Sequence, residues 1–217
     1  LYKNPSCTAH LYEQENKKYR VFCIAQEQLQ RPLIYLCMEY ELLYGFYKGS
    51  FCLIEPYQEA CSLADWLKEF HTIQERIIIC RSLVFEIMRR KLPERLCDLT
   101  LDIYSIGITP EKDVVLFLNP NFSHLQHPLH TTCVYRTSRL LADILSQAKE
   151  TRRLHRYQNP KQYQDFVKKV AQRDYHDYAQ LMNDLVHLED AFILKKRNWS
   201  FLIPVSYTHL RAHETAA

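Results

Sequence analysis

Glycine is scarce in this chain of 217 residues, which contains only Gly45, Gly49 and Gly107. A loop that cradles phosphate groups needs several glycines close together, because its backbone amides must approach the phosphate oxygens. No glycine-rich run of that kind occurs, so the sequence carries no phosphate-binding loop.

Long apolar runs and strong net charge are also missing. The richest apolar run, RIIICRSLVFEIM, is interrupted by Arg81, Ser82 and Glu86, whereas a membrane-spanning helix needs about 18 or more consecutive apolar residues. The sequence therefore predicts no membrane span. The net charge is +3 and the pI is about 8.4, which is too mild for a dedicated nucleic-acid surface. Nucleic acid is accordingly disfavoured as a partner.

Cysteine and histidine are present, but not in the spacings that bind metals. There is no CxxC pair, and His124, His127 and His130 lie in a proline-containing loop without a fourth ligand. We therefore predict no metal site. The pattern favours reduced, buried thiols in a cytoplasmic protein, with a secreted disulfide framework as the alternative. The cysteines are Cys7, Cys23, Cys37, Cys52, Cys61, Cys80, Cys97 and Cys133.

The two ends of the chain carry their own expectations. The sequence begins at Leu1 without a methionine or a signal-peptide pattern, which suggests truncation on the amino side. The last residues, PVSYTHLRAHETAA, resemble a translated adaptor sequence. We therefore predict that residues 204–217 form a non-native tail outside the folded region.

The first half of the chain reads as strands around one helix. The segment AHLYEQENKKYRVFCIA predicts two strands joined by a polar turn over 13–18. Residues 26–43 are helix-prone, and Pro32 would fit the first turn of that helix better than its interior. The segment LLYGFYKGSFCLIEPY predicts a hairpin with its turn at 48–50.

The second half reads mainly as helices. Ser62 is a predicted N-cap, and Thr72 with Glu75 forms a capping box that opens a long, predominantly buried helix through about Arg90. Pro93 ends that helix. Beyond it the pattern predicts, in order, two short strands within 98–108 and 114–123, a helix over about 138–153, and a pair of helices within 161–188.

This order of elements resembles a protein-kinase domain. The segment SFCLIEPYQEACSLADWLKEF is similar to the last strand of the small lobe, the hinge and the first helix of the large lobe. The resemblance covers about residues 9–188. It implies an α+β, two-lobed fold with a truncated, strand-rich N-lobe over 1–58 and a mainly helical C-lobe over 59–203. It also implies that Glu55 and Tyr57 face a nucleotide cleft.

The departures from the kinase pattern concern the residues that do the chemistry. LCDLTLDIYSIGI resembles the catalytic loop, and only Asp98, at the position of the catalytic base, matches. Thr100 stands where a phosphate-contacting lysine is expected, Ile103 where a magnesium-binding asparagine is expected, and Asn119 where the metal-binding aspartate is expected. Within YRVFCIA, Phe22 or a neighbouring residue takes the place of the strand lysine. Asp98 and Asn119 also fit ordinary cap and turn positions.

These departures predict a catalytically inactive kinase-like domain that binds no cofactor and serves as an interaction or allosteric scaffold for a protein partner of unknown identity. Phosphoryl transfer needs metal ions, which need oxygen ligands. An alternative is an active kinase that binds ATP and magnesium, with Asp98 as base and Asp102 or Asp113 supplying a relocated metal carboxylate. A further alternative is a helical adaptor that binds nucleic acid or acidic partners through residues 152–169.

Overall fold

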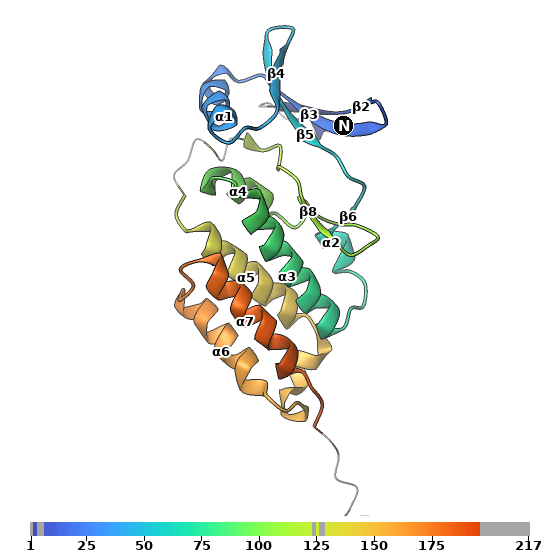
Figure 1. Ribbon diagram of the computed structural model, residues 1–217, viewed down its shortest axis with the longest axis vertical. Helices are drawn as coiled ribbons and strands as arrows, with labels where there is room; N and C mark the ends of the chain where they lie inside the picture. The colour runs from blue at the N-terminus through green and yellow to red at the C-terminus, as the bar shows by residue number, and fades with distance from the viewer. Residues whose placement is uncertain (1, 4–6, 123–124, 126–128, 196–217) are drawn as a thin grey trace, which may run out of the picture.

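The structure, a computed structural model, describes residues 2–3, 7–122, 125 and 129–195. It is a mixed α+β structure in which a small antiparallel sheet lies above a set of helices (Figure 1). The predicted tail over 204–217 lies outside the described residues, and so do His124 and His127.

The N-terminal region is a five-stranded antiparallel sheet with the strand order β1-β2-β3-β5-β4. Its two tight turns explain the register. Glu15 and Asn16 adopt positive φ, and so do Lys48 and Gly49, which is the conformation that a two-residue hairpin turn requires. Both predicted hairpins are confirmed. The strands are β1 (Tyr2–Lys3), β2 (Cys7–Gln14), β3 (Lys17–Ile24), β4 (Tyr44–Tyr47) and β5 (Ser50–Pro56).

Helix α1 (Glu27–Glu39) connects β3 to β4 and confirms the helix expected between them. The expected position of Pro32 was wrong, because this residue lies inside the helix and not in its first turn. Leu29, Leu33 and Cys37 recur every four residues and are fully buried. Their burial outweighs the hydrogen bond that a proline cannot donate.

A short connection leads from the sheet to the helices. Ser62, at the end of β6 (Cys61–Ser62), caps helix α2 (Leu63–Trp66) by accepting a hydrogen bond from the Asp65 amide at 3.1 Å, as predicted. Strand β6 joins a second, three-stranded antiparallel sheet with β7 (Ile106–Ile108) and β8 (Val114–Leu116).

Helix α3 (Ile73–Arg90) is the central helix of the lower region. The predicted capping box is present, because the Thr72 side chain accepts from the Glu75 amide and the Glu75 carboxylate accepts from the Thr72 amide. The helix ends at Lys91, which has a positive φ of 48°. Around it lie α4 (Glu94–Thr100), α5 (Cys133–Ser146), the 3₁₀ segment η2 (Lys149–Arg156), α6 (Pro160–Gln172) and α7 (Tyr178–Ala191).

The two short strands expected within 98–108 and 114–123 are present as β7 and β8. The sequence did not predict helix α4 over the segment with Asp98, in which Leu96 and Leu99 are buried. The helix expected over 138–153 begins earlier, at Cys133, because Thr132 caps it, and it ends at Ser146. The segment that follows is 3₁₀ helix.

The apolar side chains form two cores. The larger core lies among α3, α5, α6 and α7 and includes β7 and β8. The smaller core joins the five-stranded sheet and α1 to α4 and to the segment after β8. Leu92 packs against both cores. The sheet is therefore attached to the helices by continuous apolar packing.

Six of the eight cysteines are buried, and Cys61 is exposed. The expectation of buried cysteines is confirmed for most positions, and Cys23 is half-buried. In the described part of the chain, no helix is both long and apolar enough to cross a membrane.

Candidate functional site

Two of the residues that the kinase resemblance singles out, Phe22 and Glu55, lie where the sheet meets the helices, a region that we call the junction. It is formed by Arg20, Phe22, Glu55, Leu99, Leu118 and Phe122. Phe22 is fully buried, and its ring meets the ring of Phe122 edge-on with a centroid distance of 5.5 Å. Leu99 and Leu118 belong to the same apolar cluster. An aromatic pair thus occupies the point where a cleft would need a cation.

The polar half of the junction is built around Glu55, which is 5% exposed at the end of β5. Its carboxylate accepts hydrogen bonds from Arg20 on β3, at 3.2 Å from Nε and 2.9 Å from Nη2. It also accepts a bond from the Leu118 amide at 3.0 Å, and Arg90 Nη1 lies 3.9 Å away. Burial raises the pKa of the Glu55 carboxyl, while the Arg20 guanidinium opposes that rise. This one carboxylate therefore joins β3, β5, α3 and the segment after β8.

Aromatic rings enclose the Arg20 guanidinium. Its Cζ lies 5.1 Å from the ring centroid of Phe22 and 4.6 Å from that of Phe117. Tyr57 stacks on Phe117 at 5.7 Å, and the Tyr57 amide donates to the Lys18 carbonyl at 2.8 Å. Tyr57 is therefore a structural residue of the connection that leaves β5, held between the sheet and the Phe117 ring.

Asp98, the one position that matches a catalytic residue, is not in a loop. It lies in α4, is 8% exposed and forms an ion pair with Arg136 of α5. Thr100 is fully buried at the end of the same helix, and its hydroxyl donates to the Cys97 carbonyl at 2.7 Å. Both side chains are thus engaged within the helical region.

The two residues at the expected metal-ligand positions, Ile103 and Asn119, make hydrogen bonds with backbone groups. The Ile103 carbonyl accepts from the Ala64 amide at 3.0 Å, which ties the turn after α4 to α2. The Asn119 side-chain oxygen accepts from the Asn121 amide at 2.9 Å, and the Asn119 amide donates to the Leu99 carbonyl at 3.0 Å. Asn119 therefore forms a local turn that is fastened to α4.

The two alternative relocated ligands, Asp102 and Asp113, lie at opposite ends of the β7–β8 hairpin. Asp102 precedes β7 and accepts from the Tyr104 amide at 2.8 Å, whereas Asp113 immediately precedes β8 at the other end of the hairpin. The three strand residues between these ends span about 10 Å. Within the described ranges, no group of three or more histidine, cysteine, aspartate or glutamate side chains could hold a metal ion.

Sequence reasoning missed the cations of the site, namely Arg20, Arg90 and Arg136. A signal for one pair was available. Arg20 is the one charged residue within YRVFCI, and Glu55 is the one charged residue within FCLIEP. Isolated opposite charges in two strand-like runs favour a buried pair when the strands are neighbours. The pairing needs the strand order β3-β5, which crosses over α1 and β4.

Comparison with known proteins adds no relative. No model of a known protein family matches the chain, and no curated protein sequence matches it either.

Proposed function

We propose that this chain is a two-lobed, protein-kinase-like domain that does not transfer phosphate and acts in the cytoplasm by binding a partner protein. The order of the elements supports the kinase-like part of this proposal. A five-stranded sheet with one helix is followed by a connection, a long central helix, a small hairpin and further helices. Most of the cysteines are buried, which supports a reducing compartment.

The observation that carries the loss of catalysis is the engagement of the expected chemical positions in packing. Phosphoryl transfer depends on placing the phosphate groups and on neutralising the charge that develops on their oxygens. Here Asp98 is paired with Arg136, and the Asn119 side chain caps its own turn. The position expected for the strand lysine holds the buried ring of Phe22. None of these groups is free to hold a metal–nucleotide complex.

The test is thermal unfolding of the full chain with ATP, with magnesium, with both and with neither, alongside a phosphotransfer assay. A ligand at about 100 times its Kd would add roughly 2.7 kcal/mol to the free energy of unfolding. We expect no magnesium-dependent shift and no transfer. An active protein kinase, run in parallel, shows that the assay detects both.

The matched variant is Asp98→Asn, which keeps the shape of the side chain and removes its charge. Magnesium-dependent phosphotransfer by the wild-type chain that Asp98→Asn abolishes would overturn the proposal. Loss of stability in Asp98→Asn without any activity in the wild type would agree with it, because the Arg136 ion pair would be broken.

A further inference from the structure

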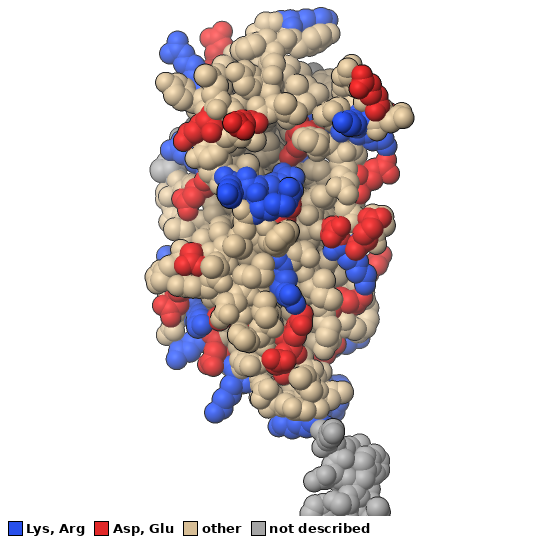
Figure 2. Space-filling view, in the orientation of Figure 1, with Lys and Arg blue, Asp and Glu red and all other residues tan. Residues whose placement is uncertain are grey.

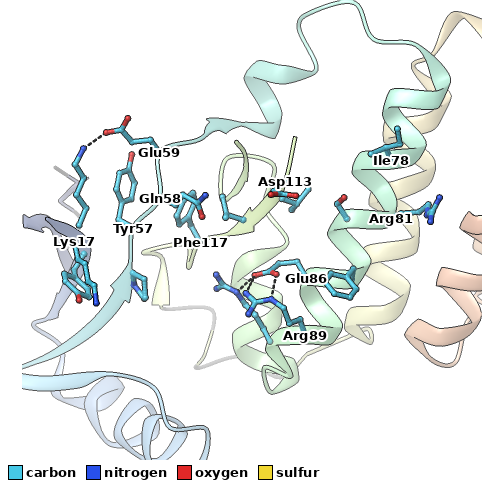
Figure 3. Close-up of a pocket in the computed structure, with 18 of the residues that line it drawn as sticks. Lys17, Tyr57, Gln58, Glu59, Ile78, Arg81, Glu86, Arg89, Asp113 and Phe117 are labelled. Carbon is cyan, nitrogen blue, oxygen red and sulfur yellow. Dashed lines mark hydrogen bonds and ion pairs between the residues drawn. The ribbon is translucent and has the colours of Figure 1, made fainter. Parts of the chain in front are cut away.

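A large groove lies on the outer side of α3, next to the junction. It has a volume of about 1540 Å³ and runs between α3, the hairpin of β7 and β8, and the connection that leaves β5. In Figure 3, Tyr57, Gln58 and Glu59 lie on one side of it, Ile78 and Arg81 on the other, and the segment with Asp113 and Phe117 lies between them. The groove is lined by neither Asp98, Thr100 nor Asn119.

One wall of the groove is an exposed apolar face. Ile78 and Phe85 lie seven residues apart, on one face of α3, and are 47% and 61% exposed. On α7, Met182 and Val186 line the same groove, and Val186 is 43% exposed. The prediction that α3 is predominantly buried holds for its other faces but not for this one. Exposed apolar side chains that line one groove are a candidate binding surface.

The upper end of the groove carries excess positive charge. Glu86 accepts hydrogen bonds from Arg89 at 2.7 and 2.8 Å and from Arg90 at 2.8 Å. Burial works to raise the pKa of Glu86, but these guanidinium groups outweigh it and the pKa is lowered. The Glu86 carboxylate therefore stays ionised and shared. When the contacts of Glu55 are included, the guanidinium groups of Arg20, Arg89 and Arg90 share two carboxylates, those of Glu55 and Glu86.

Basic residues outnumber acidic ones in the whole lining, and two of the basic residues are ion-paired, Lys18 with Glu59 and Arg81 with Glu189 outside the lining. The Arg89 side chain, 60% exposed, presents its charge to solvent. Figure 2 shows Lys and Arg side chains gathered in the middle of this face, where the upper end of α3 lies in Figure 1. The basic lining residues are Lys17, Lys18, Arg81, Arg89 and Arg90, and the acidic ones are Glu59, Glu86 and Asp113.

We propose that this groove, which we call the α3 groove, binds an acidic peptide segment of a partner protein that also carries large apolar side chains. The apolar side chains pack against Ile78, Phe85 and Val186, and the acidic side chains face Arg89 and its neighbours. The role of the bound partner protein rests on the proposed function. The position of the groove does not depend on it.

The experiment selects peptides from a random dodecapeptide phage library on the immobilised full chain, and then measures the affinity of the enriched peptides by fluorescence anisotropy. We expect the enriched peptides to combine Asp or Glu with Leu, Ile, Phe or Trp. Phe85→Ser and Arg89→Glu should each weaken binding at least tenfold. Raising the salt concentration should weaken it further, because the charges are near the surface.

Two matched controls lie away from the groove. Phe70→Ser removes another exposed phenylalanine, 66% exposed, and Arg139→Glu reverses an exposed arginine on α5. Both should leave peptide affinity unchanged. Circular dichroism of all four variants confirms that each is folded before affinities are compared.

Several outcomes would overturn the inference. These are enrichment of basic or uncharged peptides, no enrichment at all, and equal loss of binding in the groove variants and the controls. A dimer in light scattering that Phe85→Ser dissociates would assign the groove to a second copy. Tyr57 and Asp113 line the groove, whereas Asp98, Thr100 and Asn119 do not. Under the proposed function no nucleotide binds, so ATP and magnesium should not change peptide affinity. Failure of the peptide test therefore leaves the phosphotransfer test to be judged separately.

Discussion

The junction and the α3 groove differ in how completely the fold fills them. At the junction, Phe22 is fully buried and Glu55 is 5% exposed, and aromatic rings or guanidinium groups contact both. In the groove, Phe85 is 61% exposed, and on the same side of the molecule Arg89 presents its charge to solvent. The place where the sequence resembles an active site is thus packed, and of the residues singled out from the sequence only Tyr57 and Asp113 line the open surface. Function in this chain is better sought on the open surface.

The largest expected effect tests how tightly the junction is packed. Phe22→Ala removes a fully buried ring that contacts Phe122, so it should lower the free energy of unfolding by about 3–5 kcal/mol. Urea unfolding followed by circular dichroism measures it. The double variant Phe22→Ala, Phe122→Ala should cost less than the sum of the two single changes, since both rings line one cavity. A single-variant cost below about 1 kcal/mol would mean that the junction is not packed as described.

The second prediction concerns the buried ion pair. Glu55→Leu leaves Arg20 and the Leu118 amide without their carboxylate, and should cost about 3 kcal/mol. This cost in the free energy of unfolding is at the lower end of the range for breaking a buried ion pair, because 24% of the Arg20 side chain is still exposed to water. The measurement is again urea unfolding.

The control for that variant is the double change Arg20→Leu, Glu55→Leu. It should recover most of the lost stability, since an apolar pair replaces an unpaired buried charge. It should not recover all of it, because the Leu118 amide still lacks its acceptor. If the double variant were as unstable as Glu55→Leu alone, Arg20 would not be the partner that matters.

The third prediction concerns the strand between the two regions. A Cβ on Gly107 would lie 2.8 Å from the Ala60 side chain, 2.8 Å from the Phe117 ring and 2.9 Å from the Val115 side chain. Gly107→Ala should therefore cost about 1–3 kcal/mol by overpacking. Thermal unfolding compares it with Gly45→Ala, where nothing lies within 4 Å of the new methyl group. Gly45→Ala should be neutral or stabilising, and equal effects at the two glycines would contradict the close packing around β7.

Local features of the fold could be predicted because their causes are local. The Lys48–Gly49 turn needs two residues with positive φ, and the α3 capping box needs only Thr72 and Glu75. Each is specified by residues within a few positions of one another. The general α+β organisation followed from the same signals.

The parts that could not be predicted depend on distant residues. Helix α4 is short, and the apolar surface that Leu96 and Leu99 bury against comes from the sheet and from the segment after β8. The Arg20–Glu55 pair joins residues 35 positions apart. On α3, neighbours of the same type have opposite surroundings, because Ile79 is 1% exposed and Ile78 is 47% exposed. Only the packed structure decides which of the two faces solvent.

The smallest expected effect tests the open side of the comparison. Phe85→Ala removes a ring of the same size as Phe22→Ala, but from a side chain that is 61% exposed. Little apolar surface returns to water on unfolding, and alanine favours the helix more than phenylalanine does, so the free energy of unfolding should change by less than about 0.5 kcal/mol. Thermal unfolding at two protein concentrations measures it. A loss of 2 kcal/mol or more at both concentrations would show that Phe85 supports the fold; a loss only at the higher concentration would show that it holds two copies together. An unchanged midpoint at both leaves Phe85 as an apolar side chain that the isolated fold does not use, which is the property expected of a residue that a partner covers.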